Sequence, residues 1–409
     1  MRILGIPSNE YKKRRDNLLR KLPDRSIVIF LSNINSPSNL TPYRQDSNFI
    51  YMTGFKLDKS SLLLIKNGKS TKSILATEEN DPTLELWIGK RPDFKDIKRD
   101  YLFDDVIPNT KFKDMLYFYL RYSDNLYLYF PNEDIKILGK EYVLVKELKD
   151  KFPCVSINSV SQYISSLRRT KSQSEIDLMK KAISITNKGI KNAIKYVKPG
   201  VYEYQVQAAL EYGFRYANSK NNAFISIIAS GINSTTLHYS ENNSRIPENS
   251  VILFDVGSEY NYYASDISRT FPTSGKFNKK QKNIYKAVLE TQKSVINIIK
   301  PGITLKELNE FTIKLLGKEM KTMKYIKDVK DIGKYYYHSV SHPIGIDVHD
   351  VFNNGPLKAG DVISCEPGLY VKEDEIGVRI EDDILVTKTG SEILSSEIIK
   401  EINDIENLF

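Results

Sequence analysis

The stretch that decides the fold is Val251-Ile-Leu-Phe-Asp-Val-Gly257, an apolar run with one carboxylate, Asp255, near its end. A bare carboxylate in a buried strand costs free energy, so unless it is protonated Asp255 needs a positive partner, either an arginine or a metal ion. Four more residues of metal-ligand type follow, two of them in similar β-like runs: Asp266, His342, Glu366 and Glu381. A lone aspartate in a strand is usually structural, but five such residues predict a metal site.

The donor set of these five residues is mostly hard oxygen with one imidazole. It suits Mn²⁺, Co²⁺, Zn²⁺ or Fe²⁺ and does not suit a thiolate zinc site. Four carboxylates are too many for one catalytic divalent ion, and they fit two ions about 3.5–4 Å apart with bridging carboxylates. Such a pair generates hydroxide at neutral pH and polarises a carbonyl oxygen. The donor set therefore predicts a two-metal hydrolase.

The histidines are concentrated beside these candidate ligands. The chain has 4 in all, and three fall between residues 338 and 349: His238, His338, His342 and His349. A lone histidine is usually a surface or structural residue. This crowding favours a part in the chemistry, because imidazole acts as acid, base or ligand near pH 7.

A short internal repeat organises the second part of the chain. Val197-Lys-Pro-Gly-Val201 recurs as Ile299-Lys-Pro-Gly-Ile303, an offset of 102 residues (299 − 197). Each copy follows one helical pattern and precedes another. The strands with the two aspartates follow the first copy, and those with the two glutamates follow the second. A Pro-Gly helix end is common by itself, but with the paired carboxylates it predicts a duplicated helix–helix–sheet unit with the metals between its halves.

Helix and strand signals divide the chain near residues 165–170. A capping box, Ser172-Gln-Ser-Glu175, predicts a long helix that ends at Lys198-Pro-Gly200, and a second helix is expected over about 203–217. The part before the boundary predicts an α/β domain without obvious chemistry. Its expected elements are a helix over 9–22 capped by Ser8, strands at 26–31, 48–53, 61–65 and 72–76, and a hairpin turn at Asn67-Gly68.

Length and composition predict a globular protein of two or three domains, with 409 residues and 27% charged residues. The formal net charge is +9, but the lysines are scattered without a basic stripe of interleaved aromatics, so no nucleic-acid partner is expected. No apolar run approaches the ~20 residues of a membrane span, and the first residues lack a signal-peptide core. We therefore expect no membrane association and a cytoplasmic location.

The 2 cysteines, Cys154 and Cys365, predict no disulfide framework, and Cys365 is expected to be a small buried filler.

The five candidate ligands, in this order, closely resemble those of the pita-bread metallopeptidases, and within them the aminopeptidase P (Xaa-Pro aminopeptidase) family. The resemblance covers nearly the whole chain and includes Pro42-Tyr-Arg-Gln-Asp-Ser-Asn-Phe49, Thr53-Gly-Phe55 and Leu237-His-Tyr-Ser-Glu241. It implies an α/β (α+β) protein with an N-terminal domain over 1–165, for oligomerisation and screening of the substrate cleft. A pita-bread catalytic domain with an internal pseudo-twofold repeat would cover 166–409. The N-terminal match distinguishes the chain from methionine aminopeptidases.

The resemblance also implies roles for the ligands. Asp255 would bind the second metal alone, Asp266 and Glu381 would bridge the two ions, and His342 and Glu366 would complete the first. The metals would be Mn²⁺, with Zn²⁺, Co²⁺ or Fe²⁺ as alternatives. A hydroxide between them would attack the carbonyl carbon before a proline in the second position of a peptide.

Further residues receive roles from the resemblance or from their position. His238 and His349 would contact substrate and steady the tetrahedral intermediate, and His338 would help form the proline pocket. Arg379 lies two residues before Glu381, where it either holds a ligand carboxylate or is a surface strand arginine. Tyr370 either faces the cleft or packs in the core. Trp87 would line the cleft of a neighbouring subunit in a homodimer or homotetramer, although a lone tryptophan is most often a core residue.

Two departures from the family pattern concern the pocket wall. Ser339 follows His338 where glycine is common, and Pro343 follows His342 where tryptophan is frequent. The nearest alternative function is prolidase, which cuts Xaa-Pro dipeptides with the same metal core; the segments 43–49 and 86–91 favour aminopeptidase P over it. A non-catalytic pita-bread binding protein is a further alternative, and the full ligand set argues against it.

Overall fold

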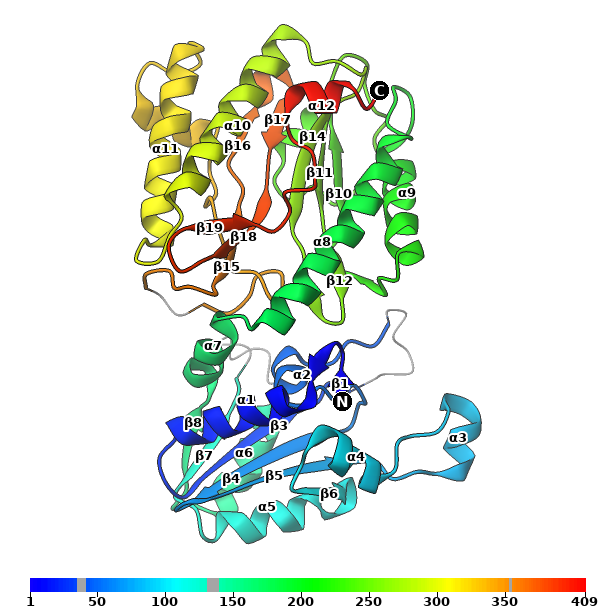
Figure 1. Ribbon diagram of the computed structural model, residues 1–409, viewed down its shortest axis with the longest axis vertical. Helices are drawn as coiled ribbons and strands as arrows, with labels where there is room; N and C mark the ends of the chain where they lie inside the picture. Colours follow the sequence, from blue (N-terminus) through cyan, green and yellow to red (C-terminus); the bar gives the residue numbers. More distant parts are fainter. Residues whose placement is uncertain (35–41, 131–139, 353–354) are drawn as a thin grey trace. The chain divides into compact units, whose positions relative to one another are not determined.

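The computed structural model describes residues 1–34, 42–130, 140–352 and 355–409. The chain divides into two compact units, Met1–Arg168 and Arg169–Phe409 (Figure 1). No helix in the described part of the chain is both long and apolar enough to cross a membrane.

The first unit is built on a six-stranded sheet with the strand order β6-β5-β4-β3-β7-β8. The strands are β3 (Ser26–Leu31), β4 (Ser61–Asn67), β5 (Ser70–Thr77), β6 (Asp105–Pro108), β7 (Asn125–Leu128) and β8 (Ser156–Ser159). Strand β4 pairs antiparallel with both β3 and β5. The outer strands pair in parallel: β6 with β5, β7 with β3, and β8 with β7. A short hairpin, β1 (Arg2–Ile3) with β2 (Ile6–Pro7), precedes the sheet.

In the described residues of this unit the helices that accompany these strands are α1 (Ser8–Lys21), α2 (Ser47–Thr53), α3 (Pro82–Ile88), α4 (Phe94–Tyr101), α5 (Phe112–Leu120), α6 (Lys140–Lys151) and α7 (Ser161–Arg169). Alternate residues of the central strands, such as Ile27 and Leu63, pack against Leu116 of α5 and Leu148 of α6. Since strand side chains alternate between faces, Val28 points to the opposite face, where it is also buried. Both faces of the sheet are therefore covered, as the apolar strand sequences require.

Most of the elements expected in this unit are present, with two corrections. The predicted hairpin is confirmed, since β4 and β5 pair with Asn67 opposite Ser70 and Gly68 has a φ of +60°. Helix α1 begins at Ser8 itself, so Ser8 is not the N-cap; Pro7 precedes the helix, and the Ser8 hydroxyl bonds the Met1 carbonyl instead.

The prediction of a strand at residues 48–53 is wrong, because this segment is helix α2. Asp46 caps the helix by accepting from the Phe49 amide at 2.8 Å, and Gly54 ends it in the left-handed conformation with a φ of +69°. Every residue from Asn48 to Thr53 is buried. An apolar run that is buried on all sides shows no period of two or of 3.6, so periodicity does not distinguish a strand from a helix here.

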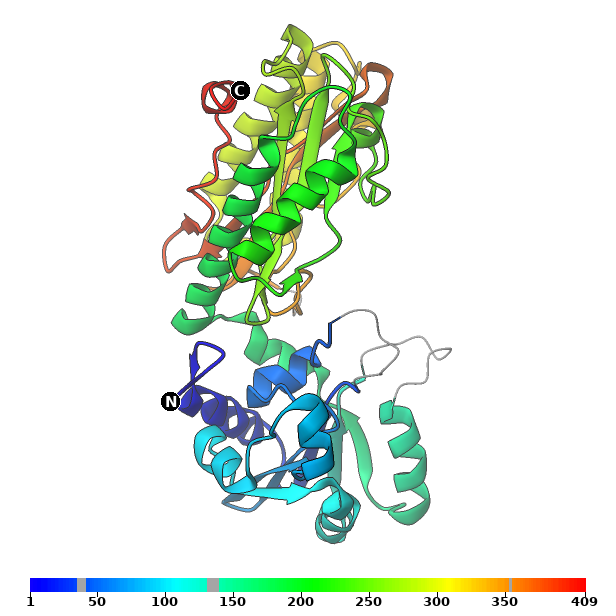
Figure 2. The same ribbon diagram turned by 90° about the vertical axis from the view of Figure 1, so that its right-hand side faces the viewer.

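The second unit places two helix pairs beside short antiparallel sheets. The helices are α8 (Gln173–Ile194), α9 (Glu203–Tyr216), α10 (Lys279–Ile298), α11 (Leu305–Thr322) and α12 (Ile402–Glu406). One sheet has the order β10-β11-β14 and a second has the order β15-β18-β19. Their strands are β10 (Ile227–Ser230), β11 (Val251–Val256), β14 (Ile267–Pro272), β15 (Val362–Cys365), β18 (Asp382–Val386) and β19 (Ser391–Ile393). Smaller pairings join β9 (Asn221–Asn222), β12 (Ser258–Tyr260) and β13 (Tyr263–Ala264), and β16 (Gly368–Val371) with β17 (Ile376–Arg379). Helix α9 packs on β10, and α10 packs on β15 and β17. Figure 2 shows the long helices of this unit lying alongside its strands.

The predicted helix starts and the internal repeat are visible in this unit. The capping box at Ser172 is formed, and α9 covers the range expected for the second helix. The two Pro-Gly turns make equivalent backbone hydrogen bonds: Gly200 donates to Ile246, as Gly302 does to Leu357. Each acceptor residue also donates back to the residue after the glycine. The duplicated helix–helix–sheet unit is thus reproduced at the level of main-chain hydrogen bonds.

Candidate metal centre

Two strand ladders bring the four candidate carboxylates to one place. In the first, Asp255 of β11 lies opposite Ser268 of β14, and Asp266 immediately precedes β14. In the second, the register pairs Cys365 with Asp382, so the next positions, Glu366 and Glu381, face each other at the end of the ladder. The Glu381 amide donates to the Ser268 carbonyl at 3.0 Å, which joins the two ladders. The pairing of the strands in these two ladders therefore positions the carboxylates.

His342 lies among these carboxylates. Its Nε2 is 3.4 Å from Asp266 Oδ2, 3.4 Å from Glu366 Oε1 and 4.0 Å from Glu381 Oε1. Its Nδ1 is 3.1 Å from the carbonyl oxygen of Pro343. Because a carbonyl only accepts, Nδ1 carries the proton, and the other nitrogen is directed at the carboxylates as a ligand nitrogen requires.

The donor set fits divalent cations. Ligand atoms of Asp266, His342 and Glu381 lie within 4.8 Å of one another. Among the residues that the structure describes, Glu381 Oε1 is buried and has no hydrogen-bond partner, whereas Oε2 accepts from the Ser268 hydroxyl at 2.9 Å. A buried carboxylate oxygen beside other carboxylates is costly unless a cation meets it.

The ionisation of the cluster shows the same need for positive charge. Burial raises the pKa of Asp266 to about 6 and that of Glu366 to about 7, and it raises the pKa of Glu381 well above its usual range. Burial alone would lower the pKa of His342, but its hydrogen bond and charge interaction with Asp266 outweigh burial and raise it to about 9. Protons and divalent cations would therefore compete for these side chains.

Arg379 is the positive partner of Asp255. Its Nη2 donates to Asp255 Oδ2 at 2.6 Å, its Nε donates to the Ser268 hydroxyl at 2.8 Å, and its Nη1 donates to the Tyr370 hydroxyl at 2.9 Å. The side chain is 4% exposed, so it is not a surface arginine. Ser268 thus links the arginine to Glu381.

A cavity of about 640 Å³ opens at this cluster. It is lined by the five candidate ligands, by Arg379, by the histidines His238, His338 and His349, and by an apolar group that includes Phe224, Ile225, Ile227, Leu237 and Val348. The ring of His349 packs edge-on against His342 with a centroid distance of 4.4 Å, and burial lowers the pKa of His349. All predicted catalytic and metal-binding residues therefore meet at one cavity.

Tyr370 lies behind this lining and not in it. Its side chain is 1% exposed, and its hydroxyl bonds His338 Nε2 at 2.9 Å as well as Arg379. Of the two placements considered from the sequence, the structure shows packing, and the prediction that Tyr370 binds substrate is not supported by its position. Trp87 lies in α3 of the first unit and is 83% exposed, so it is not a core residue of this chain.

Sequence reasoning missed two serines of the site. Ser268 bonds both Arg379 and Glu381, and the Ser364 hydroxyl accepts from the His342 amide at 2.9 Å and donates to Glu366 Oε1 at 3.2 Å. Each serine lies two residues from a candidate ligand along an extended segment. The period of two would have placed both beside the ligands.

The fold and the carboxylate–imidazole cluster define a metal-dependent hydrolase of pita-bread architecture, as predicted. Residues 177–388 match the model of metallopeptidase family M24, and residues 11–129 match that of the aminopeptidase P N-terminal domain. The chain belongs to metallopeptidase family M24.

Relatives and solved structures cover almost the full chain. The Xaa-Pro aminopeptidases of Haemophilus influenzae and Escherichia coli are 33% and 30% identical, over 98% of this chain and 97% and 98% of their own lengths. The structure of a putative aminopeptidase P from Bacillus anthracis matches with a TM-score of 0.95 at 36% identity. Aminopeptidase P from E. coli with the inhibitor Pro-Leu matches with a TM-score of 0.91 at 28% identity. Both superpositions cover 98% of this chain and 98% of the other.

Proposed function

We propose that this chain is an Xaa-Pro aminopeptidase that releases the first residue of peptides with proline in the second position. The observation that carries the proposal is the convergence of five metal-ligand side chains and three further histidines on one cavity. The full-length similarity to Xaa-Pro aminopeptidases supports the same reading.

The proposed cofactors are two divalent ions, with Mn²⁺ favoured by the oxygen-rich donor set. Asp255 would hold one ion, His342 and Glu366 the other, and Asp266 and Glu381 would be shared. When bound, such a pair supplies a nucleophile from water at neutral pH and polarises the carbonyl to be attacked. The buried Glu381 Oε1 without a partner and the directed Nε2 of His342 support this assignment.

His338 is proposed to present an uncharged imidazole to the cavity. Burial lowers its pKa to about 4. Arg379 donates to the Tyr370 oxygen, and His338 Nδ1 lies 2.9 Å from the Ser339 carbonyl. Tyr370 therefore donates to Nε2, and the chain of hydrogen bonds fixes one tautomer of His338. His238 and His349 line the same cavity, where we assign them to contacts with the substrate.

The apolar wall of the cavity supports the preference for proline. Phe224, Leu237 and Val348 offer no hydrogen-bonding side chains. A proline ring needs none, because its nitrogen carries no hydrogen. Any other residue at that position carries a backbone N–H. Burying this N–H against the apolar wall without a hydrogen-bond partner would cost free energy.

The first unit is proposed to serve oligomerisation and to contribute Trp87 to the cleft of a neighbouring copy. The exposed indole, 83% accessible, supports this assignment. The W87A variant is expected to raise the KM for a tripeptide while metal binding stays unchanged. A chain that sediments as a clean monomer would contradict the shared cleft.

The experiment that tests the function compares an Xaa-Pro-Xaa tripeptide with an Xaa-Pro dipeptide, with Mn²⁺ and with a chelator. We expect release of the first residue from the tripeptide and its loss with the chelator. A preference for the dipeptide would assign prolidase activity. Cleavage of neither peptide by protein with bound metal would overturn the proposal.

A further inference from the structure

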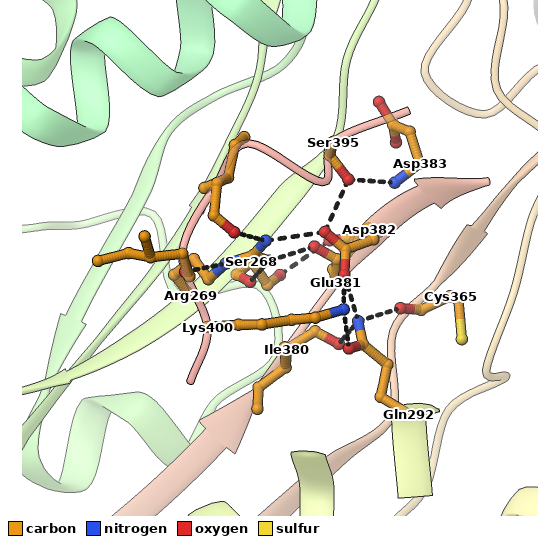
Figure 3. Close-up of polar contacts among 12 residues, drawn as sticks. Ser268, Arg269, Gln292, Cys365, Ile380, Glu381, Asp382, Asp383, Ser395 and Lys400 are labelled. Carbon is orange, nitrogen blue, oxygen red and sulfur yellow. Dashed lines mark hydrogen bonds and ion pairs between the residues drawn. The ribbon is translucent and has the colours of Figure 1, made fainter. Parts of the chain in front are cut away.

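A buried polar cluster adjoins the candidate metal centre (Figure 3). Its central residue is Asp382, directly after Glu381, with a side chain that is 1% exposed. Asp382 Oδ1 accepts from Arg269 Nη2 at 2.8 Å and from the Ser395 hydroxyl at 2.6 Å. Oδ2 accepts from Lys400 Nζ and from Gln292 Nε2. We call these five residues the Asp382 cluster; none of them lines the cavity.

Gln292 connects the cluster to the main chain that carries both glutamate ligands. Its Nε2 lies 3.2 Å from the Cys365 carbonyl and 3.0 Å from the Ile380 carbonyl. These two residues immediately precede Glu366 and Glu381. A single amide group from α10 therefore sets the separation of the two segments from which the glutamates project.

Arg269 connects the cluster to β14. Its Nη1 donates to the carbonyls of Ser268 and Glu381, so the arginine contacts the main chain of a candidate ligand from a fully buried position. Its remaining nitrogens donate to the carbonyls of Ile398 and Ile399 at 2.9 Å each. The guanidinium thus ties three segments of the chain together.

Lys400 closes the cluster from the segment 395–400. Its Nζ donates to Asp382 Oδ2 and to Gln292 Oε1, the latter at 2.9 Å. Its side chain is 15% exposed. The lysine orients the amide of Gln292, since an oxygen that accepts from Lys400 leaves the Nε2 group facing the two carbonyls.

We propose that Lys400 is a positioning residue for the metal centre, acting through Gln292 and Asp382 on the main chain of Glu366 and Glu381. Metal–oxygen distances in a bound site hold within about 0.2 Å, so a shift of either main chain weakens the hold on the ions. The segment 395–400 then helps to hold the ligand-bearing main chain in place, although it contributes no ligand itself. This role rests on the proposed ligand assignment.

The test is the Lys400→Met variant, which keeps the side-chain stem and removes the charge and the donors. We expect its dissociation constant for Mn²⁺, measured by calorimetry on metal-free protein, to rise by about tenfold or more, as for other residues that orient ligands. The electron paramagnetic resonance spectrum of the bound Mn²⁺ is expected to change as well. The Lys400→Arg variant, which keeps the charge, is expected to recover most of the affinity.

The matched control is Lys293→Met. Lys293 follows Gln292 on α10 and pairs with Glu401, next to Lys400, at 2.9 Å and with Glu290 at 3.4 Å, and neither glutamate lies on a ligand-bearing strand. Its Mn²⁺ affinity should stay within about twofold of the parent. The proposal is overturned if Lys400→Met also binds Mn²⁺ within about twofold of the parent and gives the same spectrum, even if its melting temperature falls, because the cluster would then be only structural. A parent protein that binds no Mn²⁺ would overturn both this role and the ligand assignment.

Discussion

Carboxylate side chains in the candidate metal centre are buried at positions where a bound cation would offset the free-energy cost of burying their charge. Glu381 shows this most clearly, since it is 1% exposed, and its Oε1, within the part of the chain that the structure describes, has no hydrogen-bond partner. The sequence indicated a ligand role for Glu381 because a carboxylate in an apolar run needs a partner. The period of two places Ser268 beside Asp266, but the sequence did not indicate that its hydroxyl bonds the other oxygen of Glu381, because these two residues are 113 positions apart.

Replacing Glu381 by glutamine should separate metal binding from stability. We expect E381Q to lose at least about one order of magnitude in Mn²⁺ affinity, because a carboxylate that we propose to be shared by two ions becomes a neutral amide. The metal-free melting temperature should not fall, since burial raises the pKa of Glu381 well above its usual range and so disfavours the charged carboxylate that the neutral amide replaces. Metal content and thermal unfolding measure the two effects. The exposed Glu310→Gln serves as control, and a large loss of metal-free stability in E381Q would contradict the interpretation.

Metal affinity should depend on pH with a definite sign. With the pKa of Asp266 near 6 and that of Glu366 near 7, both carboxylates take up protons as the pH falls from 7.5 to 5.5. His342, with a pKa near 9, also gives up a proton when it binds metal. Binding therefore releases protons, and the Mn²⁺ association constant should rise with pH. Calorimetry in two buffers of different ionisation enthalpy would measure the release; an affinity independent of pH would contradict it.

Secondary-structure elements that are encoded by a few adjacent residues could be predicted from the sequence. An element whose conformation depends on its burial in the fold could not. The capping box at Ser172 and the turn at Gly68 are encoded by a few adjacent residues. Helix α2 is not, since its apolar side chains fit a buried strand equally well and its caps, Asp46 and Gly54, lie outside the apolar run.

The C-cap of α2 should be more sensitive than the hairpin turn. At Gly54, with a φ of +69°, an added Cβ would lie 2.8 Å from the Tyr11 ring. At Gly68, with a φ of +60°, an added Cβ meets nothing within 4 Å. G68A should therefore lose only the about 1–2 kcal/mol of left-handed strain, and G54A should lose more. Urea unfolding of the two variants measures the difference, and equal losses would show that the Tyr11 contact relaxes without cost.

At the scale of the whole molecule, all five candidate ligands belong to the unit Arg169–Phe409. The sequence predicted a boundary near residues 165–170 and an internal repeat, but it did not indicate the pairing of Arg379 with Asp255, which are 124 residues apart. Such contacts follow from sheet register, and register depends on the entire fold.

Metal should stabilise the second unit selectively. A ligand at 100 times its dissociation constant adds about 2.7 kcal/mol to the state that binds it. We expect Mn²⁺ to raise the unfolding transition of residues 169–409 in differential scanning calorimetry and to leave that of residues 1–168 in place. Equal shifts of both transitions would contradict the assignment of every ligand to one unit.

The paired hydrogen bonds at Gly200 and Gly302 bear on how such a protein arose. Each half contributes two carboxylates, and neither half alone holds enough ligands for two ions. An ancestor with a single copy of the unit would have needed a second molecule to complete the site, with the ions on the axis between identical subunits. The imidazole of His342 comes from one half only, so the present site departs from twofold symmetry at this ligand.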